Sequence, residues 1–241
     1  MMTSRGYDMT PTMYSPDGRI YQVEYALETV KRGTLALGIK SNEGVIMAVE
    51  EKSRTLQSAG ITQKIFNIDD HIGAAAAGYI PDARVQIDNA RNFSQGNEIS
   101  YDEQVDVEVI TKHLADQCHQ FTQYAGVRPY GVALIIAGID QNGKSIYLID
   151  PSGTYVQYSA ISIGAGSDNV NDFLEKKFTS KLSQEDATIL AIAAINAKSD
   201  DMLDHTHVKI SEIRDKGVIN NLSVDKIEKY LKMAVEKYPK T

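Results

Sequence analysis

The sequence predicts an α+β protein built as a four-layer αββα sandwich, with two stacked antiparallel sheets and an extra N-terminal helix. Three observations lead to this prediction. Strand-like apolar runs come in pairs joined by short turns, which is typical of hairpins. The predicted helices stand in blocks between these pairs, so helices and strands do not alternate one by one. The 241 residues, 42% of them hydrophobic and 24% charged, suffice for one domain with a substantial core.

The chain begins with a polar segment, a turn and an amphipathic helix. Residues 1–14 are polar and show no period, which predicts a mobile N-terminal tail ahead of a single domain over residues 15–241. Residues 15–18 read SPDG, a strong turn signal. Over residues 20–32 apolar side chains recur at helical spacing, and a basic pair followed by Gly33 predicts the end of this helix.

Blocks of strands and helices follow, and two face-to-face sheets with a helix pair on each outer side would bury their apolar faces. Ser183, with Asp186 three residues later, predicts the capped start of one of the later helices. The predicted elements are strands over 35–39, 45–49, 65–68 and 72–77, helices over about 81–95 and 102–124, strands over 132–137, 146–149 and 161–163, two helices, a strand near 208–213 and a helix near 224–235.

Composition excludes several classes of function. The net charge of −7 without a basic patch argues against nucleic-acid binding. No apolar run reaches the length of a spanning helix, and residues 1–14 hold no secretory signal, so we expect a cytoplasmic protein without membrane contact. The single Cys118 excludes an internal disulfide, and the five histidines do not form a metal-ligand spacing. We therefore expect neither a metal nor another cofactor.

Three motifs carry a resemblance to a known family. Tyr7 and Asp8, followed by YSPDGRIYQVEYA at residues 14–26, resemble the signature of proteasome α-type subunits, most closely the archaeal type. Residues 78–84, GYIPDAR, resemble the start of the first long helix of that family, and residues 126–132, GVRPYGV, resemble the loop into its second strand block. The resemblance covers nearly the whole chain and implies the αββα fold of N-terminal-nucleophile hydrolases.

The resemblance also implies partners and a role. Proteasome α subunits form heptameric rings that cap rings of β-type subunits, and their N-terminal tails gate the entry pore. An ATPase or other activator docks C-terminal tails that end in a hydrophobic residue, tyrosine and any residue. The subunit would then be a non-catalytic part of a threonine-type endopeptidase complex.

Site residues follow from the same resemblance. The gate cluster comprises Tyr7, Asp8, Pro16 and Tyr25, the activator-tail pocket contains Lys64 and Gly78, and the pore constriction is formed by Tyr124, Ala125, Gly126 and Val127. Ala125 departs from the family, in which many members carry a glycine there. Other interpretations remain for some positions: a frayed terminus for the tail, simple helix packing for Tyr25, and a solvated strand-end lysine for Lys64.

An active threonine protease is the main alternative. Active β relatives use an N-terminal threonine whose free α-amine serves as the base. Here GTLALG at residues 33–38 resembles their cleavage site, so a cut between Gly33 and Thr34 would expose Thr34 as the nucleophile. Glu50 and Lys64 fall where the acidic residue and the lysine of active relatives lie.

Three features argue against this alternative. The cut would discard the helix over residues 20–32, which is patterned to pack. Ala165 stands where active subunits carry serine between two glycines, and residues 200–203 lack their Asp-x-x-Ser-Gly-Gly pattern. A third interpretation, a free-standing binding protein, predicts a monomer in solution.

Overall fold

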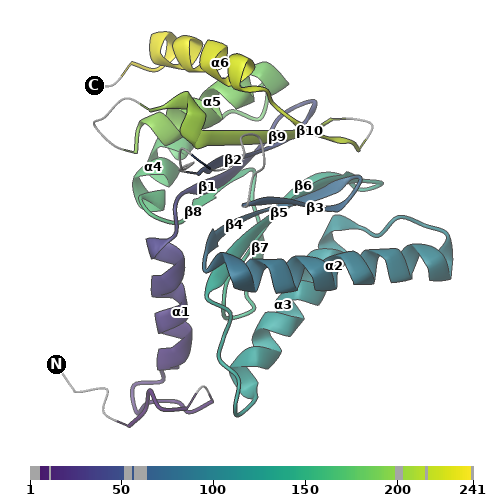
Figure 1. Ribbon diagram of the computed structural model, residues 1–241, viewed down its shortest axis with the longest axis vertical. Coiled ribbons are helices and arrows are strands. Elements are labelled where there is room, and N and C mark those ends of the chain that lie inside the picture. Colours follow the sequence, from purple (N-terminus) through teal and green to yellow (C-terminus); the bar gives the residue numbers. More distant parts are fainter. Residues whose placement is uncertain are drawn as a thin grey trace.

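The computed structural model describes residues 6–10, 12–51, 56, 64–198, 203–214 and 217–239. Two antiparallel sheets of five strands are stacked face to face, and helices cover both outer faces (Figure 1). The predicted four-layer α+β sandwich is thereby confirmed. None of the helices in these ranges is both long and apolar enough to cross a membrane.

The first sheet takes its strands from both ends of the chain. Its order is β10-β9-β2-β1-β8, with all neighbours antiparallel. The predicted hairpin forms between β1 and β2, with Gly38 opposite Met47. The strands are β1 (Ala36–Lys40), β2 (Gly44–Glu50), β8 (Ala160–Ile163), β9 (Val208–Arg214) and β10 (Ile219–Asn221).

The second sheet is a meander in the order β3-β4-β5-β6-β7. Apolar side chains from both sheets fill the space between them, including Met47, Ile135 and Ile146. Gly38 faces Ile135 and Ile146 there, so a side chain at Gly38 would collide with theirs. The strands are β3 (Ile65–Asp69), β4 (Ile72–Gly78), β5 (Val132–Asp140), β6 (Gly143–Ile149) and β7 (Tyr155–Gln157).

Helices close the two outer faces. α2 (Ile80–Tyr101) and α3 (Val107–Gln123) pack on the second sheet, while α4 (Ser167–Lys177), α5 (Gln184–Asn196) and α6 (Val224–Lys237) pack on the side of the first. A short 3-10 turn, η1 (His205–His207), precedes β9. The predicted cap of α5 forms, because the Ser183 side chain accepts a hydrogen bond from the Asp186 amide at 3.1 Å.

The only cysteine, Cys118, lies on α3 and is buried, with its sulfur 3.6 Å from Nε2 of Gln86. Burial raises the pKa of its thiol to about 12. Because the thiolate is the reactive form, Cys118 is chemically inert at neutral pH and serves as core.

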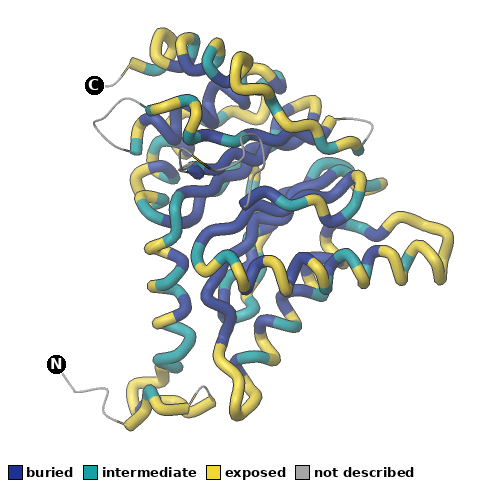
Figure 2. Tube along the Cα trace, in the orientation of Figure 1, coloured by how far each residue is buried: buried dark blue, intermediate teal, exposed yellow. Residues whose placement is uncertain are grey.

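The extra N-terminal helix, α1 (Tyr21–Arg32), stands at one side of the sandwich. It contacts β4 and β5, and only Ala26 and Val30 of its residues are buried. Its far end extends away from the sheets toward the N-terminal segment (Figure 1). The described part of the N-terminal segment is largely exposed and the far end of α1 is intermediate, in contrast to the buried strands (Figure 2).

The structure differs from the predicted elements in three respects. The three-residue strands β7 and β10 were not predicted, because so few residues show no period. α2 runs on to Tyr101, where Asp102 ends it in the left-handed conformation at φ 54°, and α3 therefore starts later than expected. The terminal helix adds a third helix on the side of the first sheet, where a pair was expected.

Candidate functional site

A buried lysine and a threonine meet at one end of the sheet interface. Lys64 precedes β3 and is 5% exposed. Its Nζ lies 2.8 Å from Oγ1 of Thr34 and donates to the carbonyl oxygens of Thr34 at 2.7 Å, Leu35 at 3.0 Å and Glu50 at 3.2 Å. Lys64 directly precedes β3 of the second sheet. Its acceptors Thr34 and Leu35 precede β1, and Glu50 ends β2, so the ammonium joins the two sheets. The alternative of a solvated lysine is wrong.

Burial decides the protonation of this lysine. It lowers the pKa of Lys64 from 10.5 to about 7, although the charges of Glu50 and Glu51 act in the opposite direction. The carboxylate of Glu50 forms an ion pair with Lys198, and both side chains are mostly shielded from water. The acidic residue therefore lies near Lys64, as expected, but its carboxylate is also paired with another lysine.

The peptide bond before Thr34 is enclosed. The Gly33 carbonyl accepts a hydrogen bond from the Ala165 amide at 2.7 Å. A Cβ at Gly33 would overlap the backbone of Gly78, and a Cβ at Gly164 would lie 2.7 Å from the Thr34 oxygen. Thr34 thus has a hydroxyl beside a lysine, and as long as the chain is uncut its nitrogen is an amide and cannot act as a base. Ala165 brings no hydroxyl to the site.

The residues predicted to form the gate partly come together within one chain. Gln22 and Tyr25 on α1 both contact Asp8: the Gln22 side-chain amide donates to the Asp8 carbonyl, and the Tyr25 hydroxyl donates to Oδ2 at 3.4 Å. Tyr7 and Pro16 are exposed, and Pro16 lies in the predicted turn, which the Ser15 carbonyl closes by accepting from the Gly18 amide at 2.9 Å.

The loop after α3 carries the four residues of the predicted constriction. Tyr124 to Val127 are exposed, and Gly126 has φ +88° with no atom near the position of a Cβ. A side chain at Gly126 would be strained by its backbone conformation rather than by crowding. Within the described chain, the tip of this loop thus stands free of the body.

The sequence did not predict how this loop is anchored. Asp82, in the first turn of α2, accepts from Nη1 and Nη2 of Arg128 at 2.6 and 2.8 Å and from the Gly131 amide at 2.8 Å. The Arg128 guanidinium also lies over the Tyr79 ring, 5.5 Å from its centroid. An acidic residue directly after Ile80-Pro81 at a helix start was the available signal, but its partner, 46 positions away, could not be inferred.

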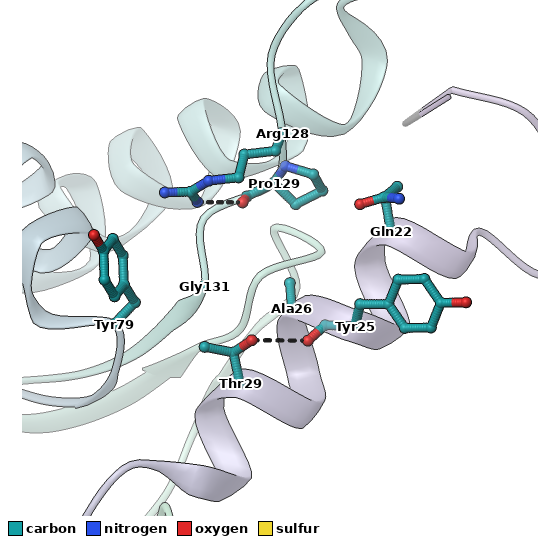
Figure 3. Close-up of a pocket in the computed structure, with 8 residues that line it drawn as sticks. All are labelled: Gln22, Tyr25, Ala26, Thr29, Tyr79, Arg128, Pro129 and Gly131. Carbon is teal, nitrogen blue, oxygen red and sulfur yellow. Dashed lines mark hydrogen bonds between the residues drawn. The ribbon is translucent and has the colours of Figure 1, made fainter. Parts of the chain in front are cut away.

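A cavity of about 360 Å³ is lined by α1, by Tyr79 and by the base of this anchored loop (Figure 3). On one wall stand Gln22, Tyr25 and Thr29 of α1, and on the other Tyr79 and Arg128 (Figure 3). Tyr25, a predicted gate residue, and the base of the loop predicted to form the constriction therefore border one cavity.

The two residues predicted to form the activator-tail pocket lie together. Lys64 and Gly78 both adjoin the Gly33–Thr34 peptide. Residues 200–202 of the expected Asp-x-x-Ser-Gly-Gly region lie outside the described residues. Among the residues that the structure describes, no group of three or more His, Cys, Asp or Glu side chains is arranged to hold a metal ion.

The stacked sheets, the threonine beside a lysine at their end and the additional α1 define a proteasome-type sandwich. The sequence model of the proteasome subunit family matches residues 30–213, and the model of the N-terminal signature of A-type proteasome subunits matches residues 7–28. The chain therefore belongs to the proteasome subunit family, among its alpha-type members.

Individual relatives agree with this assignment over the whole chain. The proteasome alpha subunit of Methanosarcina barkeri is 42% identical, with 100% of this chain and 98% of the relative aligned. The proteasome alpha subunit of Methanosphaerula palustris is 45% identical over 90% and 88%. The corresponding protein of Methanococcus maripaludis strain DSM 14266 is 41% identical over 98% and 92%.

Proposed function

We propose that this chain is a non-catalytic ring subunit of a cytoplasmic proteasome core particle. It forms a heptameric ring with other α-type subunits, stacks on β-type subunits and controls entry to their proteolytic chamber. The observation that supports the non-catalytic role is the match of residues 7–28 to the A-type signature together with the packing of α1 on β4 and β5, because a cut before Thr34 would remove both. The complex as a whole is a threonine-type endopeptidase.

Residues 1–14 form the proposed gate. Asp8 is held to α1 by Gln22 and by a long hydrogen bond from Tyr25, on a largely exposed surface. Contacts of this kind contribute little free energy, so a polar segment can exchange between arrangements without a large barrier. The exposed Tyr124 to Val127 form the proposed constriction below it.

Activator docking involves Lys64 and Gly78 in this proposal. The Lys64 ammonium already donates to Thr34, Leu35 and Glu50, so the carboxylate of an activator tail competes with internal acceptors. Several tails bound to one ring would compensate for weak single contacts through their effective concentration.

Deletion of residues 1–13 in particles assembled with a β-type subunit tests the gate. We expect faster hydrolysis of small peptides, with unchanged hydrolysis by particles that lack only Met1 and Met2. Equal rates for all three particles would refute gating by this segment.

An activator-tail peptide with a free carboxylate should stimulate the full-length particle, whereas the same peptide with a C-terminal amide should not.

Intact-mass spectrometry of the same particles tests the non-catalytic role. We expect the mass of a chain that retains the Gly33–Thr34 bond. A mass matching a chain that begins at Thr34 would identify an active threonine protease and would contradict the proposal. Size-exclusion chromatography distinguishes the remaining alternative, since a free-standing binding protein would stay monomeric even with the β-type subunit.

A further inference from the structure

One carboxylate holds the base of the loop over residues 124–131. Asp82 accepts both parallel hydrogen bonds from Arg128 and a third from the Gly131 amide. Its side chain is only 12% exposed, whereas that of Arg128 is 58% exposed. A bidentate pair between guanidinium and carboxylate fixes orientation as well as distance, so it restrains the direction in which the loop leaves the body.

The tip of the loop has no comparable restraint among the described residues. Tyr124 is 60% exposed, Val127 is 37% exposed, and no atom lies near the position of a Cβ at Gly126. The ring of Phe121 stacks on that of Tyr130 with centroids 4.5 Å apart, which brings the two ends of the loop together. This stack does not involve Arg128, so the pair between Asp82 and Arg128 is a second and separate restraint on the loop.

The same base also contacts α1. A Cβ at Gly131 would lie 3.2 Å from the Thr29 side chain, so the loop base and α1 are in close packing. The other α1 residues on this side, Gln22 and Tyr25, contact Asp8 of the N-terminal segment. In Figure 3 the Gln22 side chain lies beside Pro129, whereas the Tyr25 ring points away from Arg128.

We propose that Asp82 and Arg128 are positioning residues that fix the tip, residues 124–127, relative to α1 and the N-terminal segment it carries. This inference rests on the proposed function, because it assumes that the N-terminal segment is a gate and that residues 124–127 form a constriction. The ion pair would then fix the distance between the two. A loosened pair would leave the fold intact but allow the tip to move independently of α1.

Hydrogen exchange measured by mass spectrometry on assembled particles tests the proposal. In Asp82→Asn and in Arg128→Gln we expect the hydrogen-bonded amides at the two ends of the loop, those of Tyr124 and Gly131, to exchange about tenfold faster, because a charged hydrogen-bond pair is lost. Peptides from β4 and β5 should exchange as in the wild type. Arg128→Lys keeps the charge but not the two parallel bonds, so its exchange should be intermediate.

Asp116→Asn is the matched control. Asp116 forms an ion pair with Lys112 on α3, but both side chains are more than half exposed, and exchange at residues 124–131 should not change. Wild-type exchange there in both Arg128→Gln and Asp82→Asn would overturn the proposal. Should Asp82→Asn fail to assemble, the exposed Arg128 variants alone decide.

Failure of this inference is distinct from failure of the proposed function. The deletion of residues 1–13 in the same particles reports on gating, whereas hydrogen exchange reports on the position of the loop. If the deletion raises hydrolysis but the Arg128 variants exchange like the wild type, the gate stands and the positioning pair is refuted. Faster exchange without any effect of the deletion would support the pair and refute the gate.

Discussion

The polar groups around Thr34 are buried and make several hydrogen bonds, whereas those around Asp8 and Gly126 are more exposed and make few. At the Thr34 end, the ammonium of Lys64 is enclosed by three carbonyl oxygens and a hydroxyl, and Gly33 lies directly against the backbone of Gly78. At the other end, Tyr25 reaches Asp8 by a single long hydrogen bond, and the loop around Gly126 is exposed.

The number of contacts at each end indicates which end can change position during the proposed regulation. At the Thr34 end, the hydrogen bonds of Lys64 hold the two sheets together. The end with Asp8 and Gly126 has few contacts to lose, so its segments can change position without unfolding the body. The enclosed end thus supports stability, and the exposed end supports the proposed regulation.

The largest difference between the two ends should appear in Gly33→Ala. A Cβ there overlaps the Gly78 backbone, which cannot move without displacing β4, so we expect destabilisation by about 3 kcal/mol or loss of assembly. Thermal denaturation of the assembled particle measures the change. The control is Gly96→Ala, in a helix with free space around it, which should stabilise the chain by roughly 0.5–1 kcal/mol. Equal melting temperatures would contradict the enclosed arrangement.

A second, intermediate effect concerns Lys64→Met and pH. The variant removes the Lys64 donor from the Thr34, Leu35 and Glu50 carbonyls, of which Leu35 keeps the bond from the Glu50 amide, and this should destabilise it by about 2 kcal/mol. Because the pKa of Lys64 is lowered to about 7, the unfolded chain binds a proton between pH 7 and 10.5 that the folded chain has released. The wild type therefore gains stability with rising pH in this window, and the variant does not gain this contribution.

Melting temperatures of both proteins at pH 7, 8, 9 and 10 measure this effect. The difference between them should widen as the pH rises, since other titrating groups are shared and cancel. A constant difference would mean that the Lys64 ammonium keeps its proton throughout.

The smallest effect on stability is expected for Tyr25→Phe. The hydrogen bond to Asp8 is 3.4 Å long and Tyr25 is 44% exposed, so its loss should change stability by less than about 0.5 kcal/mol. Activator-stimulated peptide hydrolysis should nevertheless fall, because the residue belongs to the proposed gate. A large loss of stability would show that Tyr25 packs as core and would remove the contrast between the two ends.

Much of the fold was predictable because its signals are local. Alternating apolar residues indicated the β1–β2 hairpin, and the spacing of Ser183 and Asp186 indicated the start of α5. β7 and β10 escaped prediction because three residues are too few to show an alternating pattern, although each pairs with the strand directly before it in the chain. The length of α2 was underestimated because Asp102, not a glycine, supplies the left-handed residue that ends it.

The sequence indicated which residues belong to the candidate site, but not which of them contact one another. Motifs pointed to Lys64 and Tyr25, but no local pattern indicates that an ammonium 30 positions from Thr34 becomes its buried hydrogen-bond partner. The pair between Asp82 and Arg128 was missed for the same reason, since long-range contacts leave no period in the sequence. Whether the gate, pocket and constriction residues act as assigned remains a prediction.

The buried Cys118 makes this chain a convenient starting point for labelling. A maleimide reagent reacts with thiolates, and the sole native thiol is both inaccessible and far from ionised at neutral pH. A cysteine introduced in place of Ala125 or Tyr7 would then be the only site that takes up a fluorophore or a spin label. Distances between loop tip and tail could thus be followed by spectroscopy without first removing a native residue.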